Sequence, residues 1–154
     1  YKCQRLYRDA RIFSIYEGTT QLQVVAAIRY ITNGTYLGII KEMLENEVAE
    51  ELKLLQERVK KMTELYEQAV NYVKELGSQE AHDFLGRRLY DMTGDIMMSL
   101  LILDDATRAP ELFTKSANVY VRYAEEEVVG HYTYVKSFIA EDLVNFRAAK
   151  TEAE

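Results

Sequence analysis

The chain has 154 residues, a formal net charge of −6 and a hydrophobic content of 48%. This length can bury one sizeable core, and an acidic chain without a basic stripe argues against nucleic-acid binding. A single cysteine, Cys3, excludes an internal disulfide and fits a reducing compartment. One proline and seven glycines predict long helices. The first residue is Tyr1 and no signal peptide follows it, so we expect the chain to start inside a longer protein.

The N-terminal part of the chain predicts two helical segments joined by a turn. We expect a helix to end near Ile12, a turn over 14–19, and a second helix over 20–32. Asn33 and Gly34 then predict a helix stop, because both residue types tolerate the left-handed conformation found there.

A shorter helix, over 36–46, leads into a long helix that we expect over 50–76. The apolar residues of the long helix are spaced alternately by three and four positions, as in the seam of a coiled coil. They are Leu52, Leu55, Val59, Met62, Tyr66, Ala69, Val73 and Leu76. Such a helix packs along a partner over its whole length, and Gly77 ends it.

Two further long helices are predicted. Ser78 can cap the first, which ends before Pro110, and Pro110 begins the second, over about 111–138. A short helical segment over 140–149 follows. The apolar positions expected to be buried are Phe84, Leu89, Met92, Ile96, Leu100 and Leu103, then Leu112, Ala117, Val121, Ala124, Val128, Tyr132 and Val135. No strand alternation persists and the connections are short, so we predict an all-α, antiparallel up-and-down bundle of long helices.

The most informative stretch reads Arg8-Asp9-Ala10, then Ile12, then Ile15-Tyr16-Glu17-Gly18-Thr19, and continues into a helix carrying Gln21, Gln23 and Arg29. It places Glu17 in a turn between two helices, next to Gly18, which tolerates the backbone conformations of a tight turn. A carboxylate in such a turn can be directed at a substrate. This pattern resembles the catalytic-base segment of the flavin-dependent acyl-CoA dehydrogenases. It covers about the first thirty residues, and it departs from many members at Val24, where they have arginine.

The resemblance implies a division of the chain at about residue 34. Residues 1–34 would be the end of the acyl-CoA dehydrogenase C-terminal helical domain. Residues 35–154 are assigned by position alone to a helical C-terminal extension, as in the very-long-chain enzymes and several bacterial relatives. The flavin-binding sheet domain and the N-terminal helices of such an enzyme are not in this chain, so we expect the chain by itself to be inactive.

The resemblance also implies a reaction and its residues. FAD would be the cofactor, and acyl-CoA would be oxidised to trans-2-enoyl-CoA, with Glu17 as the base that removes the α-proton. Tyr16 and Gly18 fall where the family borders the substrate, and Thr19 and Gln21 fall where it contacts FAD. A turn and a helix cap without any ligand would give Thr19 and Gln21 the same pattern.

Partners and location follow from the same resemblance. The enzyme would pass electrons to an electron-transfer flavoprotein, form a homo-oligomer and act in fatty-acid β-oxidation. It would be located in the bacterial cytoplasm or the mitochondrial matrix. An alternative is a helical interaction module, with the seam over 52–76 closing a dimer, docking on the catalytic core or resting on a membrane surface. The few basic residues weigh against binding to anionic lipid. An acyl-CoA oxidase, or a DNA-damage-response flavoprotein of the same fold, is a third alternative.

Other candidate sites have weaker patterns. Glu127 and His131 are one helical turn apart and could ligate a metal, but a lone pair of this kind is more typical of a surface ion pair. His82 has no partner at ligand spacing, and Cys3 has no candidate catalytic partners. We therefore predict no metal site.

Overall fold

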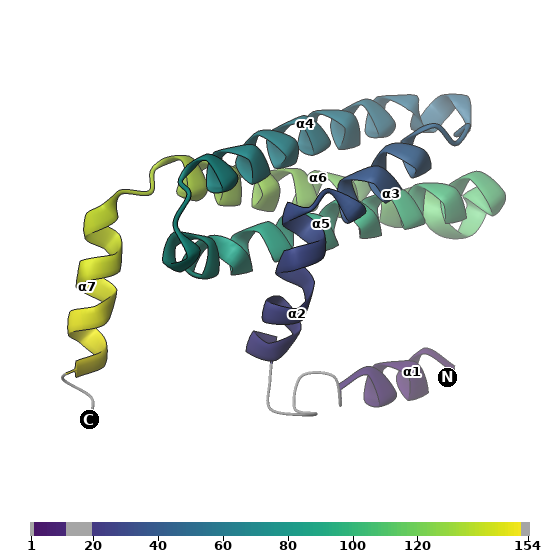
Figure 1. Cartoon of the computed structure of the whole chain (residues 1–154). Helices are drawn as coiled ribbons and strands as arrows, with labels where there is room; N and C mark the ends of the chain where they lie inside the picture. The colour runs from purple at the N-terminus through teal and green to yellow at the C-terminus, as the bar shows by residue number, and fades with distance from the viewer. Residues whose placement is uncertain (1, 12–19, 152–154) are drawn as a thin grey trace.

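The computed structural model describes residues 2–11 and 20–151, and within those ranges it contains helices and no strand. The helices, in chain order, are α1 (Lys2–Ala10), α2 (Thr20–Thr32), α3 (Thr35–Leu44), a short 3-10 turn η3 (Glu50–Leu52), α4 (Lys53–Glu75), α5 (Gln79–Arg108), α6 (Pro110–Lys136) and α7 (Ala140–Thr151) (Figure 1). The predicted all-α class is confirmed.

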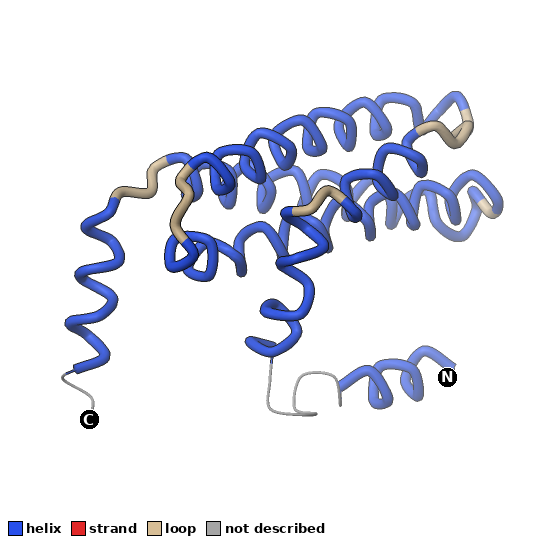
Figure 2. The backbone as a smooth tube through the Cα atoms, viewed as in Figure 1, coloured by secondary structure: helices blue, strands red, loops and turns tan. Residues whose placement is uncertain are grey.

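The three longest helices, α4, α5 and α6, lie side by side, and each runs antiparallel to the one before it (Figure 1). Short loops join them, as Figure 2 shows, so sequential helices are antiparallel neighbours. Helices α2 and α3 pack on this bundle, α2 mainly against α5. Helix α7 turns away from the bundle and touches the rest of the chain mainly through α5 (Figure 1).

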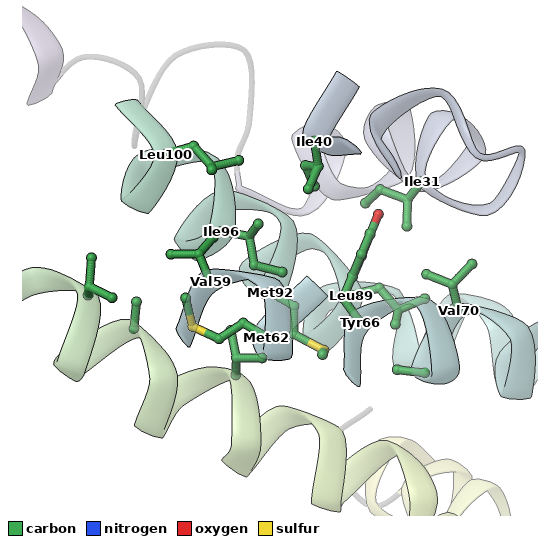
Figure 3. Packing of buried hydrophobic residues seen from close by; sticks show 14 of the residues in the cluster. Ile31, Ile40, Val59, Met62, Tyr66, Val70, Leu89, Met92, Ile96 and Leu100 are labelled. Atoms are coloured by element: carbon green, nitrogen blue, oxygen red, sulfur yellow. The ribbon is translucent and has the colours of Figure 1, made fainter. Parts of the chain in front are cut away.

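The predicted seam of α4 faces the inside of the bundle. Its residues from Leu52 to Val73 are at most 4% exposed, and Leu76 at the end is half-buried. Their partners are α5 and α6 of the same chain. Figure 3 shows Val59, Met62, Met92 and Ile96 meeting in this core. The seam is therefore not free for a second molecule, and its predicted use in dimerisation or docking is wrong.

The predicted burial of one residue of α6, Leu112, is wrong. Leu112 is 68% exposed, whereas Ala117, Val121 and the other buried positions of α6 follow a three- and four-residue spacing. Counting back four positions from Ala117 leads to Phe113, which packs against the core in place of Leu112. Tyr132 is half-buried and also packs there.

The helix ends follow the predicted turn chemistry. Gly34 and Gly77 both have positive φ angles, 88° and 61°, in the left-handed region that glycine adopts without strain. The Ser78 hydroxyl accepts a hydrogen bond from the backbone N–H of Ala81 at 3.3 Å, which confirms the cap of α5. Pro110 is the first residue of α6.

Candidate functional site

Most of the predicted catalytic motif falls outside the described residues. Tyr16, Glu17, Gly18 and Thr19 lie in the range 12–19, so their roles stay predictions. Gln21 lies in the first turn of α2, but its side chain is not described. The described part of the chain resumes directly after the motif, where α2 runs from Thr20 to Thr32.

Helix α2 is fixed to the bundle through one face. Val24, Ile28 and Ile31 are each at most 6% exposed. The approach is close because Gly86 of α5 has no side chain, and a Cβ atom there would lie 3.3 Å from Ile28 Cδ1 and 3.7 Å from Val24 Cγ1. Val24 is thus a packing residue between two helices, which gives a physical reason for an apolar side chain at this position.

The opposite face of α2 carries three exposed apolar side chains and one arginine. Leu22 and Val25 are each 56% exposed and Tyr30 is 48% exposed. Arg29 lies among them, with its Cζ 5.9 Å from the ring centre of Tyr30. Apolar side chains gathered on an exposed face are typical of an interaction surface. The outer face of α2, defined here by Leu22, Val25 and Tyr30, therefore has the character of an interface.

A second feature, which the sequence analysis missed, is a groove of about 610 Å³ on the bundle. We call it the tyrosine groove. Its walls come from α2 and α3 on one side and from α5 and α6 on the other. The side chains that define it are Tyr36, Tyr90, Tyr120 and Tyr123, with Met97, Met98, Ile31 and Thr93.

Three carboxylates line the tyrosine groove, and their partners differ. Asp91 pairs with Arg87, whose Nε lies 2.7 Å from Asp91 Oδ2. Asp95 accepts a hydrogen bond from the hydroxyl of Tyr120 at 3.3 Å. Glu127 has no ion-pair partner within the described ranges.

The predicted surface ion pair between Glu127 and His131 is wrong. His131 Nε2 instead lies 3.9 Å from Asp91 Oδ2, and the His131 side chain is only 15% exposed. The reason is that α5 packs along α6, so that a carboxylate of the neighbouring helix reaches the imidazole across the groove.

Three ionisable groups of the groove have raised pKa values, and neighbouring carboxylates contribute to each of them. Burial raises the pKa of Asp95, and the charges of Glu127 and Asp91 add to that rise. The pKa of Tyr120 is raised to about 12 by burial and by the charge of Asp95. The pKa of Tyr123 is raised chiefly by the charge of Glu127. Burial is thus the first cause of the raised pKa of Asp95 and Tyr120, and the charge of Glu127 is the first cause for Tyr123, while the Tyr120 hydroxyl and His131 lower the pKa of Asp95.

Two kinds of feature, metal-ligand clusters and membrane-spanning helices, are not found among the described residues. No three His, Cys, Asp or Glu side chains in residues 2–11 and 20–151 are grouped so that they could hold a metal ion. None of the helices in those ranges is both long and apolar enough to cross a membrane.

A sequence signal for the tyrosine groove exists in hindsight. Asp91 and Asp95 are one turn apart on α5, and Tyr120, Tyr123 and Glu127 are spaced by three and four residues on α6. Each set therefore lies on one helix face. What the sequence does not contain is the pairing of the two faces, which depends on the packing of α5 against α6.

Comparison with known proteins points to one family. The profile of the family "Acyl-CoA dehydrogenase C terminal" matches residues 32–143. The chain is also similar to a solved structure, the acyl-CoA dehydrogenase family protein from Porphyromonas gingivalis, with 37% sequence identity and a TM-score of 0.70. The alignment covers 74% of this chain and 98% of that one. No protein in the curated collection matches.

Proposed function

The chain belongs to the acyl-CoA dehydrogenase C-terminal family, and we propose that it is the C-terminal part of an FAD-dependent enzyme that oxidises acyl-CoA to trans-2-enoyl-CoA. The observation that carries this proposal is the agreement of two stretches that do not overlap. The family profile begins at residue 32, whereas the motif that resembles the catalytic-base segment lies at 8–29. Each points to the same family without using the residues of the other.

In the proposed reaction Glu17 supplies the base. Its carboxylate removes the α-proton of the thioester, a weak acid that needs a close and oriented acceptor. The backbone N–H of Glu17 holds the thioester carbonyl, where negative charge develops as the proton leaves. Tyr16 and Gly18 border the acyl chain or the thioester. The chemistry that FAD would supply here is the acceptance of the β-hydrogen as hydride.

The cofactor residues of this chain would be Thr19 and Gln21, on either side of the start of α2. Helix α2 has no acidic side chain in its first turn, so nothing on that turn neutralises the positive end of the helix dipole. A helix start of this kind fits an anionic group such as the pyrophosphate of FAD. The residues described at this end of α2 are therefore compatible with the cofactor.

An acyl-CoA oxidase would use the same base, so the electron acceptor separates the two enzymes. We propose an electron-transfer flavoprotein as the acceptor and a homo-oligomeric enzyme. The boundary near residue 34 remains a prediction.

The 154-residue chain alone is expected to show no dehydrogenation, because a base without a positioned electron acceptor cannot turn over. The measurement is anaerobic reduction of an artificial acceptor with a series of acyl-CoAs and added FAD. The complete flavoprotein, tested alongside, is expected to lose its visible flavin absorbance with an acyl-CoA of suitable length. Turnover by the chain alone, or a flavoprotein that no acyl-CoA bleaches, would contradict the proposal.

A second role has its own support. We propose that the outer face of α2 docks on the catalytic core of the enzyme, since Leu22, Val25 and Tyr30 are apolar and exposed, whereas the opposite face of the helix is packed on the bundle. The docking surface is then α2, in place of the seam of α4, which the bundle itself covers.

The docking proposal predicts that Val25→Asp behaves differently in two settings. In the 154-residue chain it should change the free energy of unfolding by no more than about 0.5 kcal/mol, because the side chain is exposed. In the complete flavoprotein it should lower the melting temperature by roughly 5 °C or more, since a carboxylate would be buried without a partner. Val119→Asp, at a site 72% exposed on α6, is the control. Equal effects of Val25→Asp in both settings would refute docking through α2.

A further inference from the structure

The tyrosine groove has a chemistry opposite to that of a site for CoA or FAD. Its lining includes three carboxylates and no lysine or arginine. Both CoA and FAD carry phosphates, which these carboxylates would repel. We infer that the tyrosine groove binds a small organic cation, whose ammonium group lies between the tyrosine rings and the carboxylates of Asp95 and Glu127. The lining of the groove includes none of the proposed catalytic residues, and the inference does not depend on them.

The aromatic part of the groove fits an ammonium group. The rings of Tyr120 and Tyr123 project from one face of α6 with their centroids 6.3 Å apart, and Tyr36 comes from α3 across the groove. A cation over the face of such a ring is attracted by its quadrupole. The same helix already makes this contact beside the groove, where Arg88 Cζ lies 4.5 Å from the ring centre of Tyr134.

The charges in the groove call for a cation from outside the chain. Arg87 compensates Asp91, whereas Asp95 accepts a hydrogen bond from the neutral hydroxyl of Tyr120 and has the imidazole of His131 in its neighbourhood. Among the described residues no lysine or arginine pairs with Asp95 or Glu127. The raised pKa values of Asp95 and of both tyrosines have the same origin, because burial and negative charge act together there. A bound cation would relieve this repulsion.

The space in the groove suits a small molecule. A volume of about 610 Å³ lies in the range of ligand pockets. Gly94 contributes to this space, because a Cβ atom at that position would meet nothing within 4 Å.

A buried polar atom lies behind the same wall. The Tyr66 hydroxyl is fully buried, and the polar side chain beside it is Thr93 of the groove. Figure 3 shows the Tyr66 side chain directed toward Ile31, another residue of the groove wall.

The experiment compares two probes of the same shape in the 154-residue chain. Choline carries a quaternary ammonium, and 3,3-dimethylbutan-1-ol replaces its nitrogen with carbon. Titration is followed by the amide resonances of glycines. We expect choline to shift Gly94 and to leave Gly77, in the turn before α5, unchanged. The alcohol should bind at least about tenfold more weakly, the ratio expected for loss of a cation–π contact and its counter-charge.

Two variants, each with a matched control, assign the binding to named side chains. Asp95→Asn should weaken choline binding about tenfold and leave the alcohol unchanged, whereas Asp105→Asn, exposed on the same helix, should change neither. Tyr123→Leu should weaken choline binding similarly, and Tyr30→Leu, outside the groove, should not. Tyr123 is 56% exposed, so its replacement leaves the core intact.

Several results would overturn the inference. They are the absence of a choline-induced shift at Gly94, equal binding of the two probes, and an Asp95→Asn variant that binds choline normally. A shift of Gly94 by coenzyme A would also do so, because it would show that the groove accepts an anion.

Discussion

Glu17→Gln in the complete flavoprotein is expected to lower the rate of flavin bleaching by acyl-CoA by about 10²–10⁴-fold. Glutamine keeps the size of the side chain but cannot accept the α-proton. The measurement is anaerobic stopped-flow absorbance of the bound flavin. The protein should remain yellow, because Glu17 is proposed to act on the substrate and not to hold the cofactor.

The control for this variant is Glu51→Gln, at an exposed position of η3. It removes the same charge from the chain far from the motif in sequence, so it should bleach at the normal rate. A Glu17→Gln enzyme that bleaches as fast as the Glu51→Gln enzyme would show that another group is the base. A colourless Glu17→Gln enzyme would instead place Glu17 in the binding of FAD.

Leu55→Ala is expected to cost about 2–5 kcal/mol of unfolding free energy in the 154-residue chain, because the side chain fills the core between the long helices. Leu55 is 4% exposed, whereas its neighbour Leu54 is 71% exposed. Leu54→Ala makes the same chemical change one position earlier and should cost no more than about 0.5 kcal/mol. Urea denaturation followed by circular dichroism gives both values.

The comparison of these adjacent leucines tests the packing of α4 directly. Both variants keep helix propensity nearly the same, since each replaces leucine by alanine in the same helix. Similar losses at the two positions would mean that α4 does not face the core along the Leu52–Val73 seam.

The sequence was sufficient for the main helices because their signals are local. The spacing of the α4 seam, the glycines at 34 and 77, the Ser78 cap and Pro110 each act within a few residues. One boundary differs slightly, because α4 begins at Lys53 after the 3-10 turn η3. The error at Leu112 arose where the apolar pattern offers two adjacent candidates, Leu112 and Phe113, and only packing selects between them.

The buried polar and small residues of α5 were harder to predict. Thr93 and Ser99 are buried because each hydroxyl donates to the carbonyl four residues earlier, at 2.7 Å, so neither needs an external partner. Gly86 is buried because α2 crosses over it. Such positions depend on which helix lies opposite, a fact that periodicity along one helix does not contain.

One of the two candidate sites could be predicted from the sequence and the other could not. Glu17 could be predicted because a catalytic turn is a contiguous motif. The tyrosine groove could not, because its carboxylates and rings come from helices that are far apart in the sequence. His131 illustrates the difference, since its partner is Asp91, forty positions away, and not Glu127 on its own helix.

The crossing of α2 over α5 has an evolutionary consequence. Because a Cβ atom at position 86 would lie 3.3 Å from Ile28 Cδ1, the two positions share one small volume. An alanine at position 86 would require the end of the Ile28 side chain to shift by a few tenths of an ångström, and a shorter side chain at position 28, such as valine, would remove that requirement. We therefore expect substitutions at these two positions to depend on each other during evolution.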